Sequence, residues 1–196
     1  YSHSNKQFSF SENLMNQFSV TIAQVKNEIK VGDSFFLLSD FQKDIWESIE
    51  KNALIGISAP TSAGKSFLIL LKAIDLIQKK SGIVVYVVPT LSLVSQVASD
   101  FRKQLDDFEL SAYSLETTYN ISSANQNSIY ILTQEKAIAA FSQSENPFGN
   151  IRLLVIDEIQ NVEKVANSDD QRSKVLYDLM IELRNNFKFD LQYLQE

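Results

Sequence analysis

The stretch Ala59-Pro60-Thr61-Ser62-Ala63-Gly64-Lys65-Ser66 decides the fold of this chain. A short apolar run at residues 54–58 precedes it, and an amphipathic segment at residues 65–80 follows it. We therefore expect a buried strand to end at Ser58, a tight loop of small residues to follow, and a helix to begin near Lys65. A strand, a small-residue loop and a helix in this order are typical of parallel sheets with helices between the strands.

Apolar runs and amphipathic segments alternate along the rest of the chain. Further strands are predicted at residues 83–88, 129–132 and 151–156, which are rich in apolar and β-branched residues, and residues 110–115 are a candidate for another strand. Further helices are predicted at residues 91–107, 134–142 and 173–187. This order predicts an α/β fold, a three-layer parallel sheet with helices on both faces.

The amino-terminal part carries two helix signals. Apolar residues spaced by three and four within residues 11–30 predict a helix, and we expect residues 1–35 to form a helical segment that packs on the core. Binding of a partner by that stripe is the alternative. Ser39 and Gln42 form a capping-box pattern, and the helix that they start should bury Ile45, Trp46 and Ile49. The main domain is then expected to span residues 36–196.

Length and composition limit the function. The chain has 196 residues, enough for one α/β domain of ordinary size, and no cysteine, so disulfides and thiolate zinc sites are excluded. A net charge of −6 argues against a broad basic surface for nucleic acid but leaves room for a narrow groove with few phosphate contacts. The apolar runs are too short to cross a bilayer. We expect a cytoplasmic protein, or a nuclear one in a eukaryote, and a chain cut from a longer protein.

Residues 59–66 resemble the Walker A phosphate loop, with Ala59 where the first glycine usually stands. Backbone N–H groups of such a loop and of the following helix start bind phosphate oxygens. The loop residues expected to contribute are Thr61, Ser62, Ala63 and Gly64. Lys65 is expected to neutralise the outer phosphates of ATP, and the Ser66 hydroxyl to coordinate Mg²⁺.

Two adjacent carboxylates, Asp157 and Glu158, follow the apolar run at residues 151–156. Ligands of parallel sheets bind outside the carboxyl ends of the strands, so this pair and the phosphate loop can meet at one edge. Asp157 is then a candidate ligand of Mg²⁺, and Glu158 a candidate base that orients and deprotonates the attacking water. The alternative is a solvated acidic start of a loop.

Five stretches, in this order, resemble motifs of the superfamily-two DExD/H-box helicases and look closest to the Ski-type branch. They are Phe36-x-Leu-x-x-Phe-Gln42, Ala59-Pro-Thr-Ser-Ala-Gly-Lys-Ser66, Pro89-Thr-Leu-Ser-Leu-Val-Ser-Gln96, Leu132-Thr-Gln-Glu-Lys136 and Asp157-Glu-Ile-Gln160. The last of these has Gln160 where His or Asp is common. The resemblance implies the first RecA-like domain of an ATP-dependent helicase or translocase, which acts on DNA or RNA.

The resemblance also implies roles for individual residues. Gln42 would read the adenine edge and Phe36 would stack on its ring, although Gln42 also suits a helix cap and Phe36 a core position. The residues implied to face nucleic acid are Thr90, Gln96 and Thr133. The two threonines also suit ordinary helix N-caps. Gln160 would couple the ATP site to the nucleic acid.

The family's ATP site lies between two RecA-like domains, and the resemblance covers only the first. We therefore expect a second RecA-like domain in the full-length protein, and weak or no ATPase activity of the isolated segment. Two other hypotheses remain open: a P-loop NTPase that acts as a switch or remodeller on a partner other than nucleic acid, and a scaffold with a vestigial motor.

Overall fold

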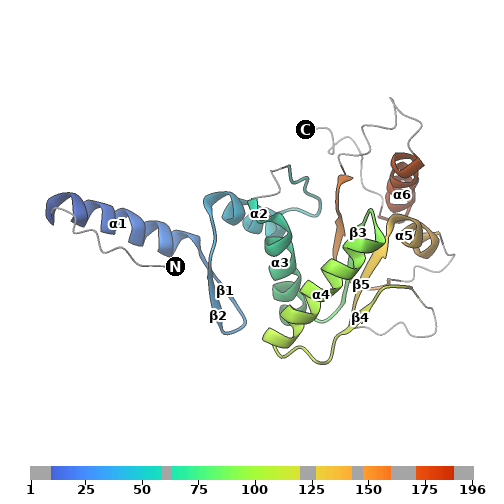
Figure 1. Ribbon diagram of the computed structural model, residues 1–196, viewed down its shortest axis with the longest axis horizontal. Coiled ribbons are helices and arrows are strands. Elements are labelled where there is room, and N and C mark those ends of the chain that lie inside the picture. The colour runs from blue at the N-terminus through green and yellow to red at the C-terminus, as the bar shows by residue number, and fades with distance from the viewer. Residues whose placement is uncertain (1–9, 59–62, 120–126, 143–147, 160–170, 188–196) are drawn as a thin grey trace.

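The computed structural model describes residues 10–58, 63–119, 127–142, 148–159 and 171–187. Its elements are α1 (Phe10–Asn27), β1 (Glu28–Val31), β2 (Ser34–Leu37), α2 (Asp40–Lys51), α3 (Lys65–Lys79), β3 (Ile83–Val88), α4 (Leu91–Asp107), β4 (Ser114–Glu116), β5 (Ser128–Thr133), α5 (Gln134–Phe141), β6 (Ile151–Ile156) and α6 (Gln171–Phe187). Figure 1 shows their arrangement.

Four parallel strands form the main sheet in the order β4-β5-β3-β6. Helices α3 and α4 cover one face, and α5 and α6 cover the other (Figure 1). The predicted α/β fold, a parallel sheet between two helical layers, is therefore confirmed. Among the described residues, no helix combines the length and the apolar character needed to span a membrane.

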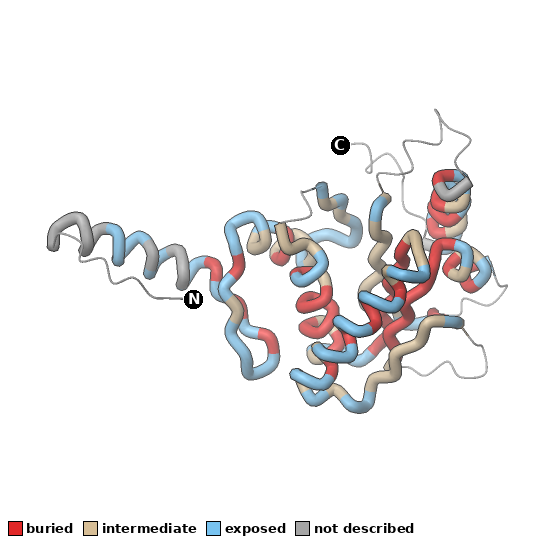
Figure 2. The backbone as a smooth tube through the Cα atoms, viewed as in Figure 1, coloured by how far each residue is buried: buried red, intermediate tan, exposed pale blue. Residues whose placement is uncertain are grey.

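Alternate side chains of β3 point to opposite faces of the sheet and contribute to two hydrophobic cores. Val84 and Tyr86 point into the core beneath α3 and α4, whereas Val85 and Val87 point into the core beneath α5 and α6. Phe101 of α4 is fully buried, and its ring lies edge-on to that of Tyr86 at 6.1 Å. Buried residues consequently follow the central strands in Figure 2. This explains why β3 and β5 read as unbroken apolar runs.

The apolar run at residues 54–58 is not a strand, and this prediction was wrong. No strand of the described part of the chain pairs with it, and its side chains are exposed or half-buried. An extended segment becomes a strand only when a neighbour satisfies its N–H and C=O groups. β6 has β3 as its neighbour on one side, and no described strand on the other.

A two-stranded hairpin, β1–β2, replaces the end of the predicted amino-terminal helix. Gly32 adopts φ +57°, and Gly32 and Asp33 form the two-residue loop between the paired residues Val31 and Ser34. A positive φ in such a loop matches the twist of the two strands. Apolar residues at positions 29 and 31 thus belong to a strand with alternating burial.

Helix α1 extends away from the sheet rather than packing on it (Figures 1 and 2). Phe18, Ile22 and Val25 of its apolar stripe are 65%, 59% and 75% exposed, in contrast to the expectation that this stripe would be buried. The Asn27 side chain donates to the Asp40 carboxylate at 2.6 Å, which ties the end of α1 to the start of α2. The helix therefore leaves the domain at a fixed junction with its stripe facing solvent.

Phe101 and Phe18 offer a matched test of this arrangement. Phe101→Ala should lower the free energy of unfolding by about 3–5 kcal/mol, because it opens a cavity in the core. Phe18→Ala should change it by less than about 0.5 kcal/mol, because the ring is exposed. Urea unfolding followed by circular dichroism measures both, and a large loss for Phe18→Ala would contradict the exposed position of α1.

Candidate functional site

Three of the predicted site residues lie at the carboxyl edge of the sheet. Thr133 ends β5 and pairs with Val88 of β3, so it lies beside the turn that leads to Thr90. Asp157 directly follows β6, and its backbone N–H donates to the Val87 carbonyl at 2.9 Å. The strand register therefore brings Thr90, Thr133 and Asp157 to one edge.

The start of α3 lies toward the same edge. Only residues 80–82 separate the end of α3 from β3, and Leu71 and Ile74 of α3 pack in one core with Val84. The helix thus runs back along the sheet, antiparallel to β3, and begins near the carboxyl ends of the strands (Figure 1). Lys65 and Asp157 consequently approach the site from a helix start and a strand end on the same edge.

Gly64 sets the geometry of this helix start. It is the N-cap of α3 and adopts the left-handed conformation, with φ +71° and ψ +26°. A Cβ at this position would lie 2.6 Å from Nε2 of Gln42. Both the backbone conformation and the close contact with Gln42 therefore require glycine.

The N-cap residue of α3 has no side chain with which to cap the helix, unlike the N-cap residues of α2, α4 and α5. Ser39, Thr90 and Thr133 accept hydrogen bonds from the first turns of α2, α4 and α5, whereas Gly64 makes no side-chain cap. The first turn of α3 also contains no acidic residue. Backbone N–H groups and the positive end of the helix dipole at such a start suit an anion.

Gln42 joins α2 to the phosphate-loop segment. The Oε1 atom of Gln42 accepts from the backbone N–H of Ser39 at 3.0 Å, and the backbone N–H of Gln42 donates to Ser39 Oγ at 3.2 Å. The predicted capping box is therefore present. The Nε2 atom of Gln42 also donates to the Ala63 carbonyl at 3.2 Å. The side-chain amide of Gln42 thus uses one of its two N–H donors, toward Ala63, and one of its two acceptor lone pairs, toward Ser39. Capping and contact with a ligand are therefore compatible.

Phe36 belongs to a small aromatic group beside the start of α3. Its ring centroid lies 6.3 Å from that of Phe67 and 6.1 Å from that of Phe108. Phe36 is half-buried, but Phe67, which directly follows Ser66, is 43% exposed. Sequence reasoning did not single out Phe67, although an aromatic residue just after Gly-Lys-Ser was a signal for it. Its accessible ring face makes it a further candidate for contact with a planar ligand.

The acidic pair has an unusual backbone. Glu158 has φ +56°, and its N–H donates to Oδ1 of Asp157 at 2.9 Å. A left-handed residue other than glycine costs on the order of 1 kcal/mol or more. Glu109, at φ +55°, has a structural reason, since it follows α4 in the two-bond turn that ends helices. Glu158 instead lies in the turn that follows β6, two residues after the strand ends.

The pKa of the Tyr86 hydroxyl, in the core near this edge, is affected by the charge of Asp157. Burial raises the pKa of the Tyr86 hydroxyl, and the negative charges of Asp157 and Asp100 raise it further. The phenol is therefore neutral at physiological pH, and the Asp157 carboxylate lies close enough to a low-polarity core for its charge to be felt there.

Oxygen donors at this edge suit magnesium better than a transition metal. Ser66 offers a hydroxyl and Asp157 a carboxylate, and the described residues contain no group of three or more histidine or acidic side chains that would enclose a cation. Mg²⁺ is typically held by one or two such protein oxygens together with phosphate oxygens and water. The residues present therefore fit a magnesium–phosphate complex.

The predicted nucleic-acid residues differ in accessibility. The Thr90 hydroxyl accepts from the Leu93 N–H at 3.3 Å and is half-buried, and Gln96 is exposed on α4. The Thr133 hydroxyl accepts from the Lys136 N–H at 3.4 Å and is only 6% exposed, so the N-cap interpretation accounts for its side chain. Thr61, Ser62 and Gln160 lie outside the described residues.

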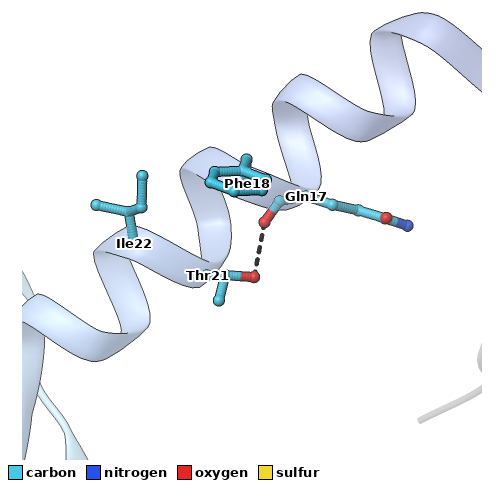
Figure 3. A pocket seen from close by; sticks show the side chains of 4 residues that line it. All are labelled: Gln17, Phe18, Thr21 and Ile22. Atoms are coloured by element: carbon cyan, nitrogen blue, oxygen red, sulfur yellow. Dashed lines mark hydrogen bonds between the residues drawn. The ribbon is translucent and has the colours of Figure 1, made fainter.

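A surface hollow on α1 is separate from this edge. Gln17, Phe18, Thr21 and Ile22 line it, and all four come from α1, which extends away from the sheet (Figures 1 and 3). Thr21 uses its hydroxyl to donate to the Gln17 carbonyl at 2.8 Å. The hollow contains no charged group and does not extend the site.

Comparison with known proteins agrees with this geometry. The model of the DEAD/DEAH box helicase family matches residues 39–189. A protein of Sulfolobus islandicus filamentous virus (isolate Iceland/Hveragerdi), named "Putative helicase 7", is 32% identical over 151 residues, which are 73% of this chain. The chain spans 23% of that relative's length. A phosphate-loop helix and an acidic strand end on one edge of a parallel sheet, together with a family match over most of its length, show that the chain belongs to the DEAD/DEAH box helicases.

Proposed function

We propose that this chain is the ATP-binding motor domain of a nucleic-acid helicase or translocase, the first RecA-like domain of a longer protein. The observation that carries the proposal is the start of α3, with the left-handed N-cap Gly64 and Lys65, on the same sheet edge as Asp157 and Glu158. The five matching motifs favour the Ski-type branch, and membership of the helicase family supports nucleic acid as the partner. A switch acting on another partner has no comparable support from the residues at this edge.

Phosphate binding is assigned to α3 and its loop. The Lys65 ammonium and the first N–H groups of α3 bind phosphate oxygens, as do loop residues Thr61 and Ser62. Ser66 and Asp157 would hold magnesium, which would supply positive charge against the charge that develops on the phosphates. The half-buried position of Lys65 supports this role, because a partly desolvated ammonium binds phosphate more strongly than one in water.

Hydrolysis is assigned to Glu158. Its carboxylate orients a water molecule and accepts the water's proton as the new bond to the γ-phosphorus forms and the bridging P–O bond breaks. The products are ADP and inorganic phosphate. Gln160 is proposed to couple hydrolysis at this site to bound nucleic acid. Thr90 and Gln96 are candidate contacts for the nucleic acid, and Thr133 would contact it through its backbone.

Adenine recognition is assigned to Gln42, with Phe36 and Phe67 beside it. Beyond its bonds to Ser39 and Ala63, the Gln42 amide has one further N–H and one further lone pair to offer. Adenine presents an acceptor at N7 beside a donor at N6, which complements such an amide, whereas guanine presents two acceptors. The site is thus expected to prefer ATP to GTP.

Lys65→Ala should weaken ATP binding by on the order of a hundredfold, because it removes a charge-assisted contact with phosphate. Lys80→Ala is the matched control, since Lys80 is exposed at the opposite end of the same helix. Titration calorimetry with Mg·ATP measures both variants. Equal affinities of Lys65→Ala and the unaltered protein would refute the phosphate-loop assignment.

Glu158→Gly and Glu109→Gly remove carboxylates from residues with nearly identical left-handed backbones. Both should gain up to about 1 kcal/mol of stability, because glycine adopts this conformation without strain. Only Glu158→Gly should abolish ATP hydrolysis by the full-length protein. Phosphate release and thermal unfolding measure the two effects, and full activity of Glu158→Gly would exclude Glu158 as the base.

Single-stranded DNA or RNA should stimulate the ATPase activity of the full-length protein, because a helicase motor couples hydrolysis to its track. The stimulation should fall as salt rises, since phosphate contacts release counterions. Steady-state ATPase assays with and without each nucleic acid measure this. Activity that neither nucleic acid changes would favour a P-loop NTPase with another partner.

A further inference from the structure

Helices α2 and α3 are joined at two places, and the spacing is the same on both. Gln42 contacts Ala63 and approaches Gly64, and Glu50 contacts Lys72 at 2.7 Å. Glu50 follows Gln42 by eight residues and Lys72 follows Gly64 by eight residues, which is about 12 Å of helix length. The segment that begins α3 and the middle of α3 are thus both joined to α2.

The second contact is built around a buried ammonium. Lys72 is fully buried, and its Nζ lies 2.7 Å from Oε1 of Glu50 and 3.1 Å from Oδ2 of Asp75. The same Nζ lies 3.9 Å from the ring centroid of Trp46, which is 5% exposed. Lys79 adds a second cation, 2.9 Å from Asp75 and 3.5 Å from Glu50. Two cations and two carboxylates thus balance one another.

Glu50 and Lys79 are both held in their charged forms within the cluster. The hydrogen bond from Lys72 holds the pKa of the Glu50 carboxyl below its usual range, against the opposing effect of burial. The hydrogen bond to Asp75 raises the pKa of Lys79. A buried charge that loses its partner is strongly destabilised, so removal of one member loosens the contact between the helices.

The cluster and the adenine-reading amide share one face of α2. Gln42, Trp46 and Glu50 are spaced by four residues, so their side chains lie in a row along the helix. Trp46 and Glu50 contact Lys72, and Gln42 contacts the end of the phosphate loop. A rotation or shift of α2 at the Lys72 end must therefore move Gln42 at the other end.

We propose that Lys72 is a positioning residue for base recognition: it fixes α2 against α3 and so holds the Gln42 amide beside the nucleotide. This inference rests on the proposed ATP site and deepens it. Phosphate binding does not depend on the position of α2, because Lys65, Ser66 and the first N–H groups belong to α3 itself. Loss of Lys72 thus acts on selectivity for the base rather than on affinity for phosphate.

The test compares Mg·ATP, Mg·GTP and inorganic tripolyphosphate binding to full-length Lys72→Met. We expect ATP affinity to fall about tenfold, the effect of one lost hydrogen bond. GTP and tripolyphosphate affinities should stay within about twofold, so the preference for ATP falls. Hydrogen–deuterium exchange should be faster in residues 40–51 and unchanged in α6.

Two matched variants control for a merely structural effect. Lys51→Met alters a lysine of α2 that is 71% exposed and pairs with Glu47, and it should leave the ATP preference unchanged. Lys72→Arg keeps the cation and should restore at least part of the preference. Should Lys72→Met fail to fold, Glu50→Gln decides the matter, because the Glu50 side chain is 44% exposed and tolerates the change.

The outcomes separate the two proposals. A Lys72→Met or Glu50→Gln protein with faster exchange in α2 but an unchanged ATP-to-GTP ratio overturns the positioning role alone. An equal loss of tripolyphosphate affinity overturns it as well, because the effect would then extend to the phosphate site. Failure of the unaltered protein to bind ATP overturns the proposed function itself, and the role of Lys72 with it.

Discussion

The contact between the Gln42 amide and the bare Cα of Gly64 is the constraint on which the site depends. It needs a left-handed residue without a side chain at the start of α3, and it brings α2 within hydrogen-bonding distance of Ala63. The same glycine leaves the first turn of α3 without a side-chain cap. One backbone position therefore shapes both the anion-binding helix start and the place where a base can be read.

Periodicity was enough to predict the layers, because each central strand is apolar on both faces. β3, α4 and β6 have the predicted bounds, α3 and α5 end one residue earlier than predicted, and β5 is one residue longer at each end. Buried parallel strands leave no polar face, so their sequences are unambiguous. The carboxyl edge of such a sheet also follows from the fold, which is why Lys65 and Asp157 could be assigned to one edge.

Features that depend on neighbours distant in sequence were not predictable in this way. Residues 54–58 have a strand-like composition, but composition does not supply a hydrogen-bonding partner. The Gly32-Asp33 hairpin was hidden because apolar residues 29 and 31 also fit a helical stripe, and only pairing with β2 distinguishes the two. The Lys72 cluster was equally hidden, since a lysine in an amphipathic helix is usually a solvated position.

Glu158 and Glu109 show how strain separates function from structure. Both have left-handed backbones, and that of Glu109 belongs to a turn with helix-ending hydrogen bonds to the carbonyls before it. Glu158 lies two residues beyond the end of β6, and its N–H donates to Oδ1 of the neighbouring Asp157. Asparagine or glycine would hold that turn at lower cost, but neither carries a proton-accepting group. A carboxylate retained at this left-handed position therefore agrees with the proposed role of Glu158 as the base in hydrolysis.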